Sequence, residues 1–182
     1  MTEINKGNPQ KTISKEWIVG ALIELMKKKP FKQINVTELS LKAGVARRTF
    51  YRHFKTTDEV LDYCLQKMCD DYISFILNQP RFETNLPKGT LWHFTYWEKH
   101  KDFLYLLKNN DLLLLLLHNF LTRYSEKIRQ MAVSKETEFL ICFIIGGQWN
   151  LLIKWIEDGA AESPQEMADM AENISTFLGK GA

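Results

Sequence analysis

Five side chains at four-residue spacing in the N-terminal third of the chain are suited to binding nucleic acid. Arg47, Tyr51 and Lys55 form one row, and Arg48 and Arg52 form a second row beside it. Residues four apart lie on the same face of a helix, so these side chains would share one surface, and no acid interrupts the stretch. Arginine can fork onto guanine, and a tyrosine hydroxyl can hold a phosphate oxygen. The pattern therefore favours a helix that enters the major groove of DNA.

The residues around this face predict the elements that would position it. Asn35 is a typical N-cap for a short helix, and Gly44 can adopt the left-handed backbone conformation that ends that helix. A second short helix is expected over about 46–54, with Phe50 and Phe54 on its inner side. Two short helices joined by a glycine-containing turn form a helix-turn-helix, whose second helix contacts the bases.

The charge of the chain is divided unevenly along its length. Residues 1–56 contain twelve Lys and Arg against four acids, whereas residues 57–182 contain twelve against eighteen. A basic segment joined to an acidic one indicates that only the first meets a polyanion. We expect a DNA-binding domain over 1–57 and a larger helical domain over 58–182.

Helical spacing of apolar residues extends through most of the chain, and strand patterns are nearly absent. The first helix is expected to open at Thr12 and to end before Pro30, and the last to begin with a capping box at Ser163 and Glu166. The sequence predicts an all-α fold of three short helices followed by a larger helical domain. Its further helices are expected over 58–77, 90–108, 111–131, 135–158 and 164–178.

The segment from Phe139 to Ile156 is apolar on nearly every face. A helix that is apolar all round must be covered all round, and a second copy of the chain is the expected cover. A glycine pair inside this helix would allow close approach of the partner helix. The residues expected at the dimer interface are Phe139, Phe143, Gly146, Gly147, Met167, Met170 and Ile174.

Aromatic residues are frequent in the same half of the chain and could line a pocket for a small apolar or aromatic effector. The same residues could equally form the core, and the sequence leaves both interpretations open. The candidate effector-binding residues are Trp92, Tyr96, Trp97, Tyr124 and Trp149.

Several other classes of protein find no support. No signal peptide is visible, and the longest purely apolar run, 139–145, is far shorter than the roughly 20 residues of a spanning helix. Cys64, Cys69 and Cys142 are expected to be buried and reduced. No metal-ligand spacing, catalytic grouping or cofactor motif is present. We expect a cytoplasmic protein that is not an enzyme and does not contact a membrane.

The segment GVARRTFYRHF, from Gly44 to Phe54, resembles the signature of TetR-family transcriptional repressors, and the resemblance covers about residues 10–65. A Gly-Gly pair, seven intervening residues, Trp-Ile and a following Ser-Pro together resemble the C-terminal segment of a Firmicutes-type subgroup of that family. Two positions depart from the family pattern. Ala46 replaces a capping residue, and Thr57 replaces a lysine that commonly approaches the DNA backbone.

The resemblance implies which residues contact DNA. Arg47, Arg48 and Thr49 would face bases or nearby phosphates, and Tyr51 and His53 would hold phosphates. Thr37 would contact the DNA backbone from the preceding helix, and Arg52 and Lys55 complete the basic face.

The resemblance also implies a function. We expect a homodimer that binds a palindromic double-stranded operator, represses transcription and is released by a small-molecule effector. Control by a partner protein or by abundance alone, and activation in place of repression, remain open at this point.

Overall fold

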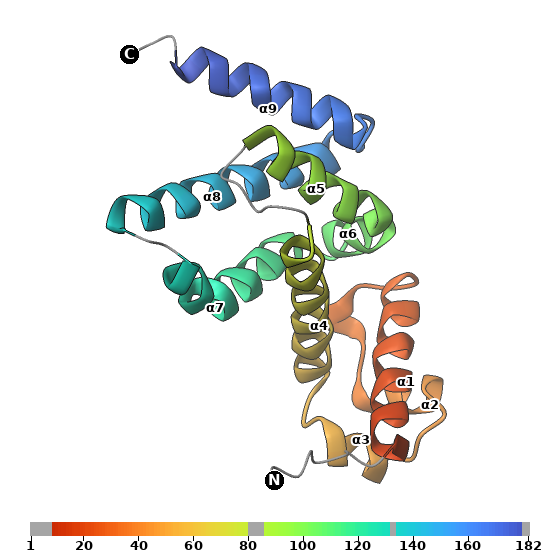
Figure 1. Ribbon diagram of the computed structural model, residues 1–182. Helices are drawn as coiled ribbons and strands as arrows, with labels where there is room; N and C mark the ends of the chain where they lie inside the picture. Colours follow the sequence, from red (N-terminus) through yellow and green to blue (C-terminus); the bar gives the residue numbers. More distant parts are fainter. Residues whose placement is uncertain (1–8, 80–85, 132–133, 180–182) are drawn as a thin grey trace, which may run out of the picture. The chain divides into compact units, whose positions relative to one another are not determined.

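The chain folds into two compact helical units. The computed structural model describes residues 9–79, 86–131 and 134–179, and describes side chains for residues 13–79, 86–122 and 134–177. Every regular element in these ranges is a helix (Figure 1), which confirms the expected all-α class. The units comprise residues 1–67 and 68–182, so their boundary lies inside α4 (Thr57–Leu77) and not at residue 57.

The N-terminal unit contains α1 (Pro9–Met26), the short 3-10 helix η1 (Phe31–Gln33), α2 (Val36–Lys42), α3 (Arg47–His53) and the start of α4. The expectation that Thr12 caps α1 is wrong, because the helix already begins at Pro9, a residue suited to a first turn. The side chains that form the centre of this unit are fully buried. They are Ile18, Leu22, Leu39, Phe50 and Val60.

Local signals account for the ends of α2 and the start of α3. The Asn35 side chain accepts a hydrogen bond from the Glu38 N–H at 3.0 Å, and Gly44 leaves the helix with φ of 65°. The Glu38 carboxylate does not complete a capping box, because it pairs with Lys29. Ala46 precedes α3 without any side-chain cap. The first N–H groups of the short α3 therefore have no hydrogen bond from a capping side chain.

The start of α4 belongs to the N-terminal unit because its side chains contact α1. Lys67 donates to the Glu16 carboxylate at 2.8 Å, and the Tyr63 hydroxyl donates to the same residue at 3.4 Å. The Lys15 ammonium lies 3.6 Å from the centroid of the Tyr63 ring, a cation–π contact. These contacts fix the first half of α4 against α1.

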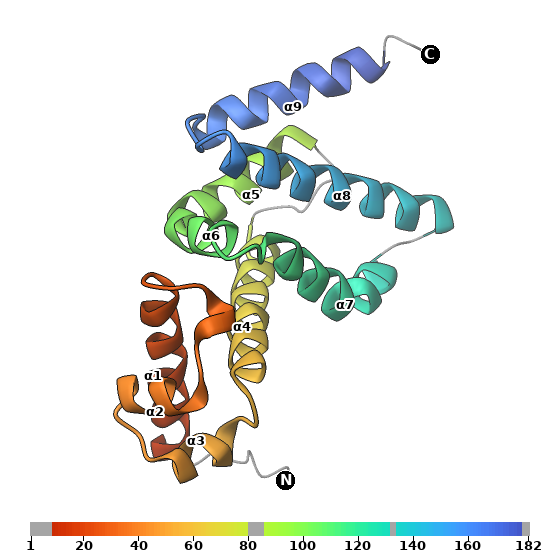
Figure 2. The same cartoon turned by 180° about the vertical axis from the view of Figure 1, so that it is seen from behind.

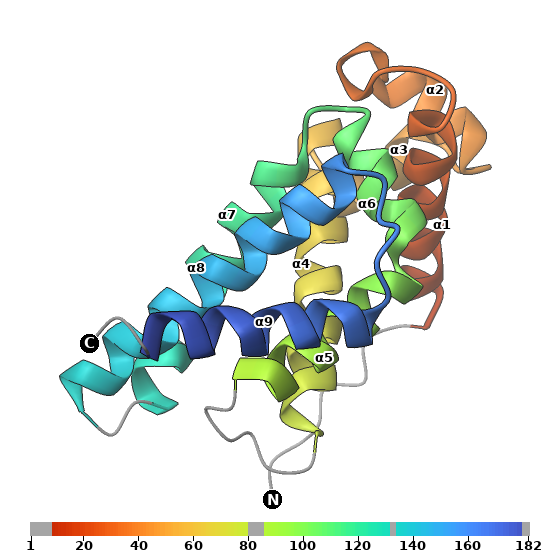
Figure 3. The ribbon, with the colours of Figure 1, turned by 90° about the horizontal axis from the view of Figure 1, so that it is seen from above.

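The C-terminal unit contains α5 (Leu86–Lys99), α6 (Lys101–Lys108), α7 (Leu113–Met131), α8 (Lys135–Glu157) and α9 (Pro164–Gly179). Figures 2 and 3 show α9 lying against α5, its main contact within the unit. The single helix expected over 90–108 is wrong, because the chain turns at His100 between α5 and α6. The turn lets Trp97 on α5 and Leu104 on α6 both reach the core, where each is fully buried.

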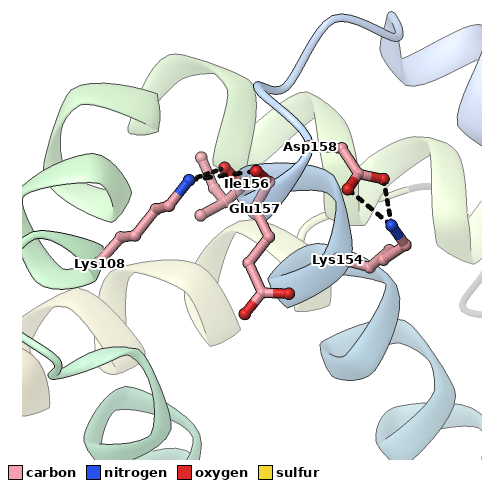
Figure 4. A network of polar contacts seen from close by, with 5 residues as sticks. All are labelled: Lys108, Lys154, Ile156, Glu157 and Asp158. Atoms are coloured by element: carbon pink, nitrogen blue, oxygen red, sulfur yellow. Dashed lines mark hydrogen bonds and ion pairs between the residues drawn. The ribbon is translucent and has the colours of Figure 1, made fainter.

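The two ends of the α8–α9 connection are held by polar contacts. Lys108 donates to the carbonyl oxygens of Ile156 and Glu157 at 3.0 and 3.2 Å, placing a cation at the negative end of α8 (Figure 4). At the start of α9, the Glu166 N–H donates to the Ser163 hydroxyl oxygen and the Glu166 carboxylate accepts from the Ser163 N–H. The capping box expected from the sequence is therefore present.

The missing cap on α3 yields a stability prediction. Ala46→Ser would supply an acceptor for the first N–H groups of α3 and should stabilise that helix by about 1 kcal/mol. Asn35→Ala is the matched opposite, because it removes an existing cap from α2 and should cost a similar amount. Hydrogen exchange of the α3 and α2 amides, followed by mass spectrometry, measures both changes. Unchanged exchange in α3 of Ala46→Ser would contradict the prediction.

Candidate functional site

The buried side of α3 determines which of its residues face outward. Phe50 is completely buried and Phe54 nearly so, with their ring centroids 6.1 Å apart. Phe54 also packs on Tyr63 of α4, at 5.8 Å between centroids. Because a helix has one inner face, these rings direct the side chains on the other face away from the core.

The outward side of α3 and the residue after it carry the basic side chains. Arg47, Arg48, Arg52 and Lys55 are exposed, and Tyr51 is half exposed. The Arg47 guanidinium donates to the Tyr51 hydroxyl at 3.5 Å, so these two side chains lie together one helical turn apart. Guanidinium and hydroxyl groups presented in this way can contact phosphates and base edges.

Two further DNA-binding candidates are placed differently. Thr37 is exposed in the first turn of α2, whereas Thr49 is half-buried in α3. His53 is also half-buried, and its Nε2 lies 2.8 Å from the Ser14 hydroxyl oxygen of α1. This bond joins α1 to the last residue of α3, a contact that the sequence analysis did not foresee. The imidazole thus has a structural partner in addition to any role at DNA.

The aromatic candidates of the C-terminal unit are mostly core residues. Trp97 and Trp149 are almost fully buried, and their ring centroids are 5.4 Å apart. Tyr96 is also buried, and its hydroxyl donates to the Met68 carbonyl oxygen. Trp92 is partly exposed, and Tyr124 lies outside the side chains that the structure describes.

The centre of this cluster is Tyr72 of α4, a residue that the sequence analysis missed. Its hydroxyl lies 2.7 Å from Nδ1 of His93, which is completely buried. Burial lowers the pKa of His93 to about 3 and raises the pKa of Tyr72, so both groups are neutral at physiological pH. The rings whose centroids lie within 6.0 Å of the Tyr72 centroid are His93, Tyr96, Trp97, Phe120 and Trp149.

The candidate dimer residues fall into two groups. Phe139 and Phe143 of α8 are 66% and 72% exposed, and Met170 and Ile174 of α9 are nearly half exposed. Met167 differs, because it is buried within its own protomer and is not available to an interface.

The glycine pair lies in open space. Gly147 is exposed and Gly146 partly so. A Cβ added at either position would meet no atom within 4 Å, apart from the local helix backbone. Among the residues that the structure describes, no contact therefore requires glycine at these two positions.

Helix α8 is covered on one side only. Trp149, Leu152 and Ile156 are buried, whereas Cys142 is exposed, against the expectation that all three cysteines are buried. By length and composition alone α8 could also cross a membrane, with a mean hydropathy of 1.6 over a window of which 33% is buried. Helices of soluble protein cores pass the same test, and the buried side of α8 packs as such a helix does.

Comparison with known proteins identifies both units. Residues 18–64 match the family model described as bacterial regulatory proteins of the tetR family. Residues 84–176, half of the chain, match the model described as a transcriptional regulator C-terminal region, whose label also bears the TetR name. Residues 18–64 include all of α2 and α3, so the matched region contains the helix-turn-helix described above.

Similar proteins include a curated relative and two solved structures. The uncharacterized HTH-type transcriptional regulator YerO of Bacillus subtilis is 29% identical over 109 residues, which make up 54% of this chain and 36% of that protein. The fatty acid degradation regulator FadR of Bacillus halodurans has a TM-score of 0.60 at 18% identity, covering 93% of this chain and 96% of that one. The dihydroxyacetone kinase operon activator DhaS has a TM-score of 0.54 at 19% identity, covering 92% and 96%.

The two structural likenesses are below 25% identity and support the fold alone. The family models carry the assignment, because one covers the helix-turn-helix and the other covers half of the chain. The family consists of DNA-binding regulators and not of enzymes. This chain therefore belongs to the TetR family of transcriptional regulators.

Proposed function

We propose that this regulator binds a palindromic operator as a homodimer and reads it with the outward face of α3. The observation that carries the proposal is the acid-free, exposed face of Arg47, Arg48, Arg52 and Lys55 on a helix whose other side is buried. Such a face suits the major groove, where arginine distinguishes guanine and lysine meets phosphate. Two copies related by a two-fold axis would meet half-sites about 34–36 Å apart.

The residues of the face have different roles in this proposal. Arg47 and Arg48, in the first turn of α3, reach base edges, since the N-terminal part of a recognition helix lies deepest in the groove. Tyr51 and Lys55 bind phosphates, as does Thr37 from α2. Thr49 and Arg52 complete the contact surface. His53 holds α3 against α1 through the hydrogen bond between its Nε2 and Ser14. In this proposal its imidazole also contacts a phosphate.

Dimerisation through α8 and α9 is supported by the apolar side chains of these helices that are exposed in the single protomer. Phe139 and Phe143 expose most of their area, and apolar surface of this kind is costly to leave in water. The open space beside Gly147 would admit a partner helix at close range.

The regulator acts as a repressor in the cytoplasm and is released by a small apolar or aromatic effector. The aromatic cluster around Tyr72 packs as part of the core, and it also carries polar atoms of tyrosine, histidine and tryptophan that an effector entering the C-terminal unit could contact. An effector must bind the released state more tightly than the DNA-bound state to shift the equilibrium between them.

DNA binding is tested with an operator selected from a random duplex library. Arg48→Ala should weaken operator binding by about 1–3 kcal/mol and relax the sequence preference at one base pair, because it removes a bidentate hydrogen bond from the guanidinium to a base. Lys55→Ala should weaken selected and scrambled duplexes alike and lower the slope of log affinity against log salt by about one. Mobility shifts over a range of salt concentrations measure both effects.

The control for these variants is Lys99→Ala, which removes an exposed lysine from α5. It should leave both affinity and salt slope unchanged. Equal affinity of the unaltered protein for selected and scrambled duplexes would refute specific reading of the operator.

Assembly is tested by filling the space beside the glycine pair. Gly147→Leu adds a side chain whose Cβ meets no atom of the described part of the chain beyond the local helix backbone, and leucine favours the helix, so the protomer should fold normally. In a dimer the same side chain would force the partner helices apart, and we expect monomers by multi-angle light scattering. Phe143→Asp should have the same effect, because it places a charge in the interface.

Leu114→Asp, on the exposed side of α7, is the matched control, since it alters a similarly exposed apolar residue that belongs to neither α8 nor α9. It should remain dimeric. A folded Gly147→Leu dimer together with a Phe143→Asp dimer would show that assembly uses another surface.

A further inference from the structure

Two buried polar atoms in the aromatic cluster lack a hydrogen-bond partner within the described residues. They are Nε2 of His93 and Nε1 of Trp97. Both residues are completely buried and lie four apart on α5, one helical turn from each other on the same face. Buried polar groups in native proteins are nearly always hydrogen-bonded. Two such nitrogens one helical turn apart, on rings whose centroids are 6.4 Å apart, are therefore candidates to donate to an acceptor from outside the chain.

The bond between Tyr72 and His93 indicates that both open atoms are donors. Imidazole at this site is neutral, so one of its nitrogens carries a proton and the other accepts. If Tyr72 donates to Nδ1, the proton lies on Nε2 and only that N–H is left without a partner. In the other tautomer both the Tyr72 O–H and the bare Nε2 would be open. The first arrangement leaves fewer polar groups without a hydrogen bond, so Nε2 of His93 is assigned as a donor. Nε1 of Trp97 is also a donor, because an indole N–H cannot accept.

The surroundings favour a neutral acceptor over an anion. The rings in contact with His93 are Tyr72, Phe94, Trp97 and Trp149, and none of them carries a charge. A carboxylate or phosphate placed against these donors would be buried without a counter-ion, an unfavourable arrangement in an apolar site. A carbonyl oxygen accepts two hydrogen bonds without that penalty.

We infer that the effector of this regulator is a small neutral molecule with an aromatic or apolar part and a carbonyl oxygen, and that His93 Nε2 and Trp97 Nε1 donate to this oxygen. The inference rests on the proposed release by an effector and specifies its chemistry. Because Trp97 and Trp149 are almost fully buried, the molecule binds a state in which these rings have separated.

The experiment compares acetophenone with ethylbenzene, which has nearly the same shape but no oxygen and is the more apolar of the two. Binding to the full-length protein is followed by tryptophan fluorescence and by the indole N–H signals in nitrogen-15 NMR spectra. Acetophenone should bind at least about tenfold more tightly than ethylbenzene and should shift the Trp97 indole signal downfield. Benzoate, the anionic analogue, should bind more weakly than the ketone.

Variants identify the donors. Trp97→Phe and His93→Leu should each bring the affinity ratio of acetophenone to ethylbenzene close to one. The matched control is Trp155→Phe, which removes an indole N–H that already donates to the Glu162 carbonyl oxygen at 3.0 Å. It should keep the ketone preference. Without any ligand, Trp97→Phe should lower the melting temperature less than Trp155→Phe, because only the latter loses a hydrogen bond.

Three results would overturn the inference. They are equal binding of acetophenone and ethylbenzene, a ketone preference that survives in both donor variants, and a Trp97 signal that no probe moves. Operator affinity is measured in parallel for every variant. If acetophenone binds with full selectivity but does not lower operator affinity, release by an effector is refuted and the carbonyl site remains supported.

Discussion

The burial of Phe50 and Phe54 is the interaction on which the orientation of the basic face of α3 depends. Helix α3 has seven residues and no N-terminal side-chain cap, and a helix this short is unstable on its own in water. Packing against α1 and α4 therefore both creates the helix and fixes its rotation about its axis. The hydrogen bond between His53 and Ser14 holds the far end of the same helix. The orientation of the basic face is thus a property of the whole N-terminal unit.

Much of the fold could be predicted because its signals are local. Asn35, Gly44 and the capping box at Ser163 act on neighbours within a few residues, and the structure has each of them in place. The boundary between the units could not be predicted in this way. It depends on contacts of Tyr63 and Lys67 with Glu16, which lies 47 and 51 residues earlier in the chain.

The same distinction applies to the candidate sites. The outward face of α3 follows from the position of two phenylalanines four residues apart, whereas Ser14, the partner of His53, lies 39 residues away. His93 carried no signal because a lone histidine has no preferred partner, and Tyr72 lies 21 residues from it. For α8 the sequence pattern does not predict which side is buried, since a helix that is apolar all round has no polar face to mark the exposed side. The exposure of Cys142 could not be read from it.

The uncovered side of α8 would link the stability of this protein to its concentration if a second copy covers it. If a second copy covers Phe139 and Phe143, mass action raises the melting temperature as protein accumulates. At a few copies per cell, a share of the chains would be single and unable to span both halves of a palindrome. The two phenyl rings would then set a minimum abundance below which the regulator leaves its promoter unoccupied, whatever the affinity of α3 for each half-site.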